Sequence, residues 1–174
     1  FTQDTLTVYN LLGDPALRIA GNAEASGTKS AAQVVLLGLA QTYDGTARSV
    51  AATTEPAGLA VDFTYDGLAM APTAAGSYAV VATVNDENYE GSASGTLTIG
   101  KADQTIQFPV IGGQTPADAV GLAATASSGL PVSFAVGSGP ATISGGTNLS
   151  FTGAGSVSVV ASQPGDGNWN AAAE

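Results

Sequence analysis

The chain of 174 residues is acidic, with four Lys and Arg against 14 Asp and Glu and a net charge of −10. This charge disfavours binding to a nucleic-acid backbone or to an anionic membrane surface, because both would repel the protein. The sequence contains neither Cys nor His, which excludes disulfides and thiolate metal sites and removes the commonest nucleophile and general base. We therefore expect no enzyme activity. No apolar run approaches the roughly 18 residues of a membrane span.

The first 19 residues stand apart from the rest of the chain. Residues 5–9 alternate polar and apolar side chains, which predicts a half-buried strand. Residues 9–19 read YNLLGDPALRI and resemble the end of the catalytic domain of gingipain-like cysteine peptidases of the C25 class. That resemblance implies a peptidase domain upstream of Phe1 that would carry the catalytic residues; a generic strand and turn at a domain border is the alternative. Residues 20–32 are small and polar, which is typical of a linker.

Residues 33–100 predict a first unit made of short strands and tight turns. Only 10% of all residues are charged and 23 are Gly, with Thr and Ser at many polar positions, which favours strands joined by turns. Gly38 is a candidate bulge, Asp44-Gly45 predicts a hairpin turn and Asp66-Gly67 a second turn, because such turns need a positive φ. The predicted strands lie at residues 34–39, 49–54, 59–65, 77–84 and 94–99.

Four stretches of this unit resemble the MBG family of bacterial Ig-like repeats. They are QTYDGTA at 41–47, FTYDG at 63–67, AGSY at 75–78 and NYEGSA at 88–93. The resemblance implies a small β-sandwich of the kind found in long, secreted or surface-attached bacterial proteins. It implies no enzymatic activity.

Residues 101–174 predict a second unit, joined to the first by Lys101-Ala102 with almost no spacer. The stretch SSGLPVSF at 127–134 resembles a related bacterial Ig-like repeat. The predicted strands lie at residues 104–110, 119–126, 131–136, 141–144, 148–152 and 156–161. The chain is thus interpreted as all-β, with two tandem Ig-like β-sandwiches preceded by a short strand and a linker.

An internal repeat supports two units and also shows where they differ. Residues 75–93 contain an Ala-Gly-Ser entry and a Val-Val-Ala centre that recur in residues 154–173. Asn88-Tyr89 then corresponds to Asn168-Trp169. In the first unit the strand at 94–99 follows this pair, whereas no equivalent strand follows it in the second. We therefore expect the second sandwich to lack its last strand and to expose a sheet edge that recruits a donated strand or aggregates.

Two groups of residues are candidate sites. Asp86, Glu87 and Asn88 offer oxygen ligands of the type that Ca²⁺ prefers, but they match no known calcium loop and are ordinary turn residues. The aromatic side chains, with Tyr89 and Trp169 at equivalent repeat positions, suit either sugar stacking or a shared packing role at the end of a strand. The packing role and the turn role are the favoured interpretations.

These patterns predict a non-catalytic spacer or accessory region of a larger exported bacterial surface protein. Its partners would be the upstream and downstream domains of the same protein, and a strand donated to the second sandwich. The alternative is an adhesin or glycan-binding module that contacts cell-surface glycans or proteins. A third hypothesis places the region beside a cysteine peptidase domain, where it would assist folding, substrate access or surface display.

Overall fold

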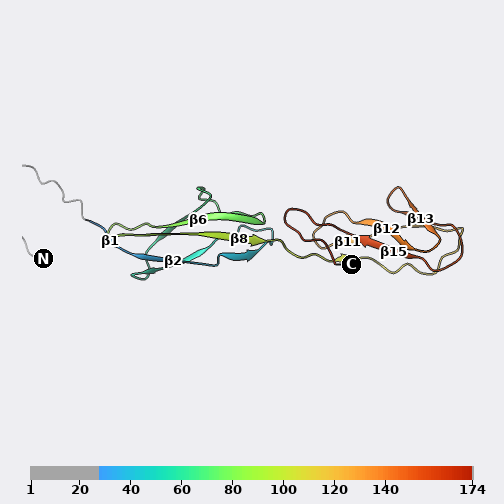
Figure 1. Cartoon of the computed structure of the whole chain (residues 1–174), viewed down its shortest axis with the longest axis horizontal. Coiled ribbons are helices and arrows are strands. Elements are labelled where there is room, and N and C mark those ends of the chain that lie inside the picture. The colour runs from blue at the N-terminus through green and yellow to red at the C-terminus, as the bar shows by residue number, and fades with distance from the viewer. Residues whose placement is uncertain (1–27, 174) are drawn as a thin grey trace, which may run out of the picture.

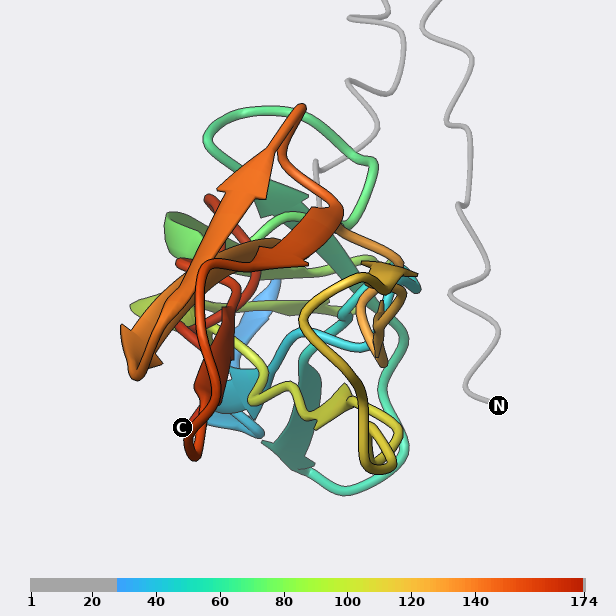
Figure 2. The same cartoon turned by 90° about the vertical axis from the view of Figure 1, so that its right-hand side faces the viewer.

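The computed structural model describes residues 28–173, and within them every regular element is a β-strand. The strands form two Ig-like β-sandwiches that lie end to end, so the molecule is long and narrow (Figure 1). Viewed along the long axis, the two units overlap (Figure 2). The predicted all-β fold is confirmed. No helix in the described part of the chain is long and apolar enough to cross a membrane.

The first unit contains eight strands. They are β1 (Ser30–Ala31), β2 (Gln33–Leu37), β3 (Ala40–Thr42), β4 (Ala51–Glu55), β5 (Val61–Tyr65), β6 (Gly76–Val84), β7 (Tyr89–Glu90) and β8 (Ser92–Gly100). A two-stranded sheet of β2 and β4 and a four-stranded sheet in the order β3-β8-β6-β5 form the sandwich. The core between them contains five buried residues: Val50, Tyr65, Val80, Leu97 and Ile99.

The predicted first strand at 34–39 is observed as β2, which pairs with β4 and ends at Leu37. A further short strand, β3, follows it and runs parallel to β8 in the larger sheet. Gly38, between the two strands, has a φ of 74°, which a residue with a side chain rarely adopts. The expected irregularity at this glycine is therefore the point where the chain passes from one sheet to the other.

The two Asp-Gly turns have different roles. Asp66 and Gly67 both have a positive φ, and Tyr65 bridges to Leu68 across them, as in a tight two-residue turn. The hairpin predicted at Asp44-Gly45 is wrong, because the strands on either side of it pair with different partners. That segment instead connects the two sheets, and the carboxylate of Asp44 accepts hydrogen bonds from the amide and hydroxyl of Thr46.

The second unit has shorter strands. They are β9 (Ile106–Gln107), β10 (Ala119–Gly121), β11 (Thr125–Ala126), β12 (Ser133–Ser138), β13 (Ala141–Ser144), β14 (Asn148–Phe151) and β15 (Ser158–Ser162). Its sheets are β11-β9, β12-β15 and β10-β14-β13. Leu122 and Leu149 are its buried aliphatic residues beyond Ala102.

Several strand predictions need correction. The run at 104–110 forms a ladder at Ile106–Gln107 alone, and Val110 is 96% exposed. The predicted strand at 119–126 is divided into β10 and β11, which belong to different sheets. The predicted linker at 20–32 ends earlier than expected, because Ser30–Ala31 is a strand that pairs with β7. The predictions for residues 1–27 lie outside the described residues.

The registers of the two units correspond residue by residue. Phe63 pairs with Ala82 in the first unit, and Phe134 pairs with Ala161 in the second. Val34 pairs with Thr54, and in the same way Ile106 pairs with Ala126. The duplication that the sequence predicts is therefore present in the backbone pairing, with β15 in the position of β6 and β12 in the position of β5.

Candidate functional site

A set of hydrogen bonds and packing contacts lies where the two sandwiches meet. We call this region the joint; it consists of residues 101–104, which lead into the second unit, and residues 166–170, which follow β15. Ala102 forms a parallel bridge with Trp169, and the amide of Ala102 donates to the carbonyl of Asn168 at 2.9 Å. The ammonium group of Lys101 donates to the carbonyl of Asp166 at 2.5 Å. Residues far apart in the sequence are thus joined where one unit meets the other.

Two contacts cross from the joint to the first unit. The side-chain Oδ1 of Asn168 accepts a hydrogen bond from the amide of Ala75 at 2.9 Å. The ring of Trp169 packs edge-to-face on Tyr43, with centroids 5.6 Å apart and planes at 83°. Edge-to-face geometry is a favourable arrangement for aromatic pairs and is worth about 0.5–1.5 kcal/mol beyond the buried area. These two contacts therefore join the second unit to the first at points other than the covalent link.

A buried amide pair fixes the joint to the second unit. Gln104 is 4% exposed and Gln163 is 6% exposed, and the Nε2 of Gln104 donates to the Oε1 of Gln163 at 3.1 Å. The same Nε2 donates to the carbonyl of Asn170 at 2.7 Å, and the Nε2 of Gln163 donates to the carbonyl of Pro131 at 3.2 Å. Buried amides without partners are costly, so this network favours a single position for residues 166–170.

This amide pair was not predicted from the sequence. Each Gln replaces an apolar or small residue of the first unit, Ala32 and Val84, which the internal repeat aligns with them. The signal that could have identified the pair is that two positions with small or apolar residues in the first unit have Gln in the second.

The first unit begins with the same arrangement of residues. The ammonium group of Lys29 donates to the carbonyl of Asp86 at 2.7 Å, as Lys101 does to Asp166. Ser30 pairs in parallel with Tyr89, as Ala102 does with Trp169. The duplication therefore includes the entry into each sandwich as well as the sandwich itself.

The acidic turn predicted as a calcium candidate has a structural role. The Oδ1 of Asp86 accepts hydrogen bonds from the amides of Asn88 at 2.8 Å and Tyr89 at 3.1 Å. Asp166 caps the equivalent turn in the second unit in the same way. Within residues 28–173, no group of three or more Asp or Glu side chains is placed to hold a metal ion. Calcium binding by Asp86, Glu87 and Asn88 stays a prediction that calorimetric titration with calcium tests.

The two aromatic candidates occupy the equivalent positions that the repeat predicts. Both Tyr89 and Trp169 are half-buried and begin the short parallel pairing at the entry of their unit. The structure places Trp169 against Tyr43, so its ring is engaged in packing between the units. The two candidates do not gather into one platform: Tyr89 pairs with Ser30 of β1, whereas Trp169 lies beside Tyr43 at the joint. In Figure 1, β1 lies at the end of the first unit that is far from the second unit.

Comparison with known proteins supports the interpretation of the first unit. The family model of the MBG domain matches residues 32–103, which is less than half of the chain. The MBG domain is a β-rich module of a non-catalytic type, in agreement with the structure of this unit. No curated protein and no solved structure matches the chain. The match includes neither residues 9–19 nor the second sandwich beyond Asp103.

Proposed function

We propose that residues 28–173 form a rigid, non-catalytic spacer that holds neighbouring domains of an exported bacterial surface protein at a fixed separation. The observation that supports this function best is the joint, where Trp169 and Asn168 contact Tyr43 and Ala75 of the first unit. The covalent link of Lys101-Ala102 alone would allow the units to bend. Contacts on a second, independent segment restrict that bending.

The end-to-end arrangement also fits a spacer. Two small sandwiches in line give a long, narrow body (Figure 1), and strands that run along the long axis resist extension through many backbone hydrogen bonds. The match of residues 32–103 to the MBG domain supports a modular role. The acidic, cysteine-free composition is compatible with an exported surface protein. Fractionation of cells that produce the parent protein, with an antibody against this region, tests the location.

NMR relaxation measures the rigidity of the joint directly. In the native chain, the two units should share one anisotropic rotational diffusion tensor. Trp169→Ala should make their tumbling partly independent and broaden the particle dimensions in small-angle X-ray scattering, whereas Trp169→Phe should retain most of the coupling. Asn168→Ala should loosen the joint and Asn168→Asp, which keeps the acceptor oxygen, should not. Independent tumbling in the native chain would rule out a rigid spacer.

A second function, adhesion, is favoured by one surface feature. Leu68 is 68% exposed and Met70 is 81% exposed on the loop between β5 and β6, in a chain with few charged residues. The hydrogen bonds between Tyr65 and Leu68, at 2.7 and 2.9 Å, hold the base of this loop. The loop therefore displays apolar side chains on a fixed support, as a contact site for another protein requires.

Binding to cells or to cell-wall material tests this second function. The double variant Leu68→Ser/Met70→Ser should lose binding if the loop is adhesive. Val110→Ser, which replaces a 96% exposed apolar residue of the second unit, is the matched control. If both variants bound cells as well as the native chain does, the spacer would be the supported function.

An association with a cysteine peptidase belongs to the same proposal, because a spacer of this kind would separate a catalytic domain from its attachment. The support comes from the sequence of residues 9–19 alone. A Cys and a His in a caspase-like αβ domain immediately before Phe1 would support it, and a further sandwich there would contradict it.

A further inference from the structure

Within the described residues, the second sandwich has a free sheet edge where the first sandwich has β8, an inner strand of its larger sheet. In the first unit, β6 lies between β5 and β8. In the second unit, β15 corresponds to β6 and pairs with β12, and among residues 28–173 no strand pairs with its other edge. The edge that β8 would occupy is therefore open, as the sequence analysis predicted.

The strand β8 provides the centre of the core in the first unit. Leu97 is 0% exposed and Ile99 is 2% exposed, and both lie in the cluster that joins the two sheets. Gly95, two residues earlier, lies against Leu36 and Leu39: a Cβ added there would be 3.0 and 3.2 Å from their methyl groups. The strand thus combines a small residue with two large aliphatic residues on one face.

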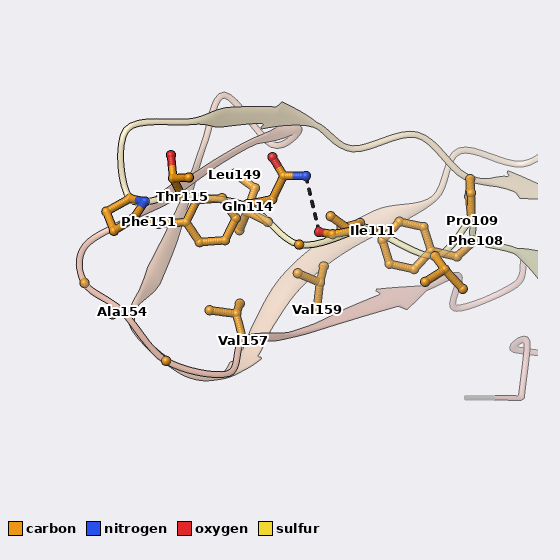
Figure 3. A pocket seen from close by; sticks show the side chains of 16 residues that line it. Phe108, Pro109, Ile111, Gln114, Thr115, Leu149, Phe151, Ala154, Val157 and Val159 are labelled. Carbon is orange, nitrogen blue, oxygen red and sulfur yellow. Dashed lines mark hydrogen bonds between the residues drawn. The ribbon is translucent and has the colours of Figure 1, made fainter.

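The corresponding space in the second unit is a groove with both apolar side chains and exposed backbone in its walls. Its volume is about 570 Å³, and its walls include Phe108, Ile111, Leu149, Phe151, Val157 and Val159. Figure 3 shows Val157 and Val159 pointing from one side toward Phe151 and Ile111 on the other. By the internal repeat, Phe108 and Ile111 correspond to Leu36 and Leu39, on which β8 packs in the first unit. We call this space the strand groove.

The residues after the joint contact the end of β15 at its free edge. The amide of Ala172 donates to the carbonyl of Gln163 at 2.9 Å, beside the end of β15. In the first unit, β8 begins at the same point, where Ser92 pairs with Thr83 near the end of β6. Residues 171–173 therefore reach the point at which β8 begins in the first unit.

We propose that the strand groove is the binding site for an added β-strand that continues from residues 171–173, antiparallel to β15. The occupant has the chemistry of β8: a small residue that fits over Phe108 and Ile111, followed at alternate positions by two large aliphatic residues. Backbone hydrogen bonds to β15 provide affinity, and the apolar walls select the alternating side chains. Intervening positions face solvent and accept Thr or Ser, as in β8.

Two features favour a strand over a small apolar ligand. A ligand would cover the apolar walls but would leave the backbone groups along the free edge of β15 unpaired, and a strand satisfies both. The groove is also continuous with residues 171–173, which already form a hydrogen bond to the strand end. A second copy of this chain is a poor donor, because its own β8 is buried in its first unit.

The test adds a strand with the sequence of β8. A copy of Gly95–Gly100, with the sequence GTLTIG, is attached after Glu174 so that it keeps the register set by residues 171–173. The melting temperature of the second unit should rise by about 10 °C, since about 1 kcal/mol shifts a domain of this size by roughly 4–8 °C. Amide hydrogens along the free edge of β15 should become protected from exchange, and a dye that binds exposed apolar surface should be released.

The matched control is an extension with Ser at the two aliphatic positions, which should give a much smaller rise and weak protection. The free GTLTIG peptide, added to the unextended chain, should protect the same amides at high concentration. Equal stabilisation by both extensions, no change with either, or protection accompanied by dimer formation in sedimentation would overturn the proposal. The proposal would also be overturned if the folded chain that carries the GTLTIG extension still bound the dye.

Discussion

The two sandwiches share a pairing register but have different cores. In the first unit, five buried side chains meet between the sheets, and two of them, Leu97 and Ile99, come from β8. In the second unit, Leu149 is 1% exposed, whereas Val159, which corresponds to the fully buried Val80, is only half-buried. The comparison shows that the core of this fold depends on its last strand, because that strand lies at the centre of the larger sheet.

Polar contacts partly replace apolar packing in the second unit. Gln104 and Gln163 are buried and bonded to each other and to backbone carbonyls, at positions where the first unit has Ala32 and Val84. A hydrogen bond contributes about 1 kcal/mol net, less than the burial of a large aliphatic side chain at about 1.5–3 kcal/mol. The second unit should therefore be the less stable of the two.

Truncation in the two cores should show this difference most strongly. Leu97→Ala should lower the free energy of unfolding of the first unit by about 2–5 kcal/mol, because it leaves a cavity in a fully packed core. Val159→Ala, on β15 at the position that corresponds to Val80 of β6 and beside the strand groove, should cost about 1 kcal/mol or less. Denaturation followed by Trp169 fluorescence for the second unit and by circular dichroism for both units checks these values. Equal losses would contradict the proposed dependence on β8.

A single hydroxyl group also distinguishes the units. The hydroxyl of Tyr65 accepts a hydrogen bond from the buried amide of Val50 at 3.0 Å, whereas the second unit has Val136 at this position. Tyr65→Phe leaves that amide unpaired and should cost about 1–3 kcal/mol in the first unit. Tyr78→Phe is the control, since its hydroxyl donates to the carbonyl of Ala74 at an exposed position and its loss should cost about 0.5 kcal/mol at most. Urea denaturation measures both.

The two units differ in whether the residue just before β8, or its equivalent in the second unit, can carry a methyl group. A Cβ added to Gly91 would lie 2.2 Å from the carbonyl oxygen of Ala32, so Gly91→Ala forces the backbone to shift and should cost about 1–3 kcal/mol. The second unit has Ala171 at the equivalent position. Ala171→Gly should cost about 1 kcal/mol or less, through backbone entropy. A large loss for Ala171→Gly and none for Gly91→Ala would contradict the assigned equivalence.

The smallest expected effect is a dependence on pH with one contribution from each unit. In the first unit, the hydroxyl and amide of Thr46, together with Arg48, lower the pKa of Asp44 below its ordinary 3.8. In the second, the amide and hydroxyl of Thr115 lower the pKa of Asp118. A lowered pKa stabilises the folded state above about pH 4, and this contribution disappears as the pH falls through the folded pKa.

NMR titration of the Asp carboxyl signals checks these pKa values. Asp44→Asn should remove the contribution of the first unit without changing that of the second, and Asp118→Asn should do the reverse. An unshifted titration of either carboxylate would contradict the hydrogen bonding described for that loop.

Much of the fold could be predicted because it depends on local patterns. Alternating side chains predicted β5, β6, β8, β12, β13, β14 and β15 to within about two residues at each end. Asp66-Gly67 predicted a tight turn because its two residues must both adopt a positive φ. Asp44-Gly45 has the same residues and forms no hairpin, because the partner of each flanking strand lies elsewhere in the sequence.

The sequence by itself determined the β class of this protein and the duplication. These features follow from side-chain alternation, turn chemistry and the internal repeat. Only the tertiary structure decided that residues 104–110 form little regular pairing, that Gln104 and Gln163 are buried together, and that Trp169 packs on Tyr43. Each of these three features depends on which residues from a distant part of the sequence lie alongside. Local sequence patterns do not specify those neighbours, and a strand forms regular pairing only where a neighbouring strand satisfies its backbone hydrogen bonds.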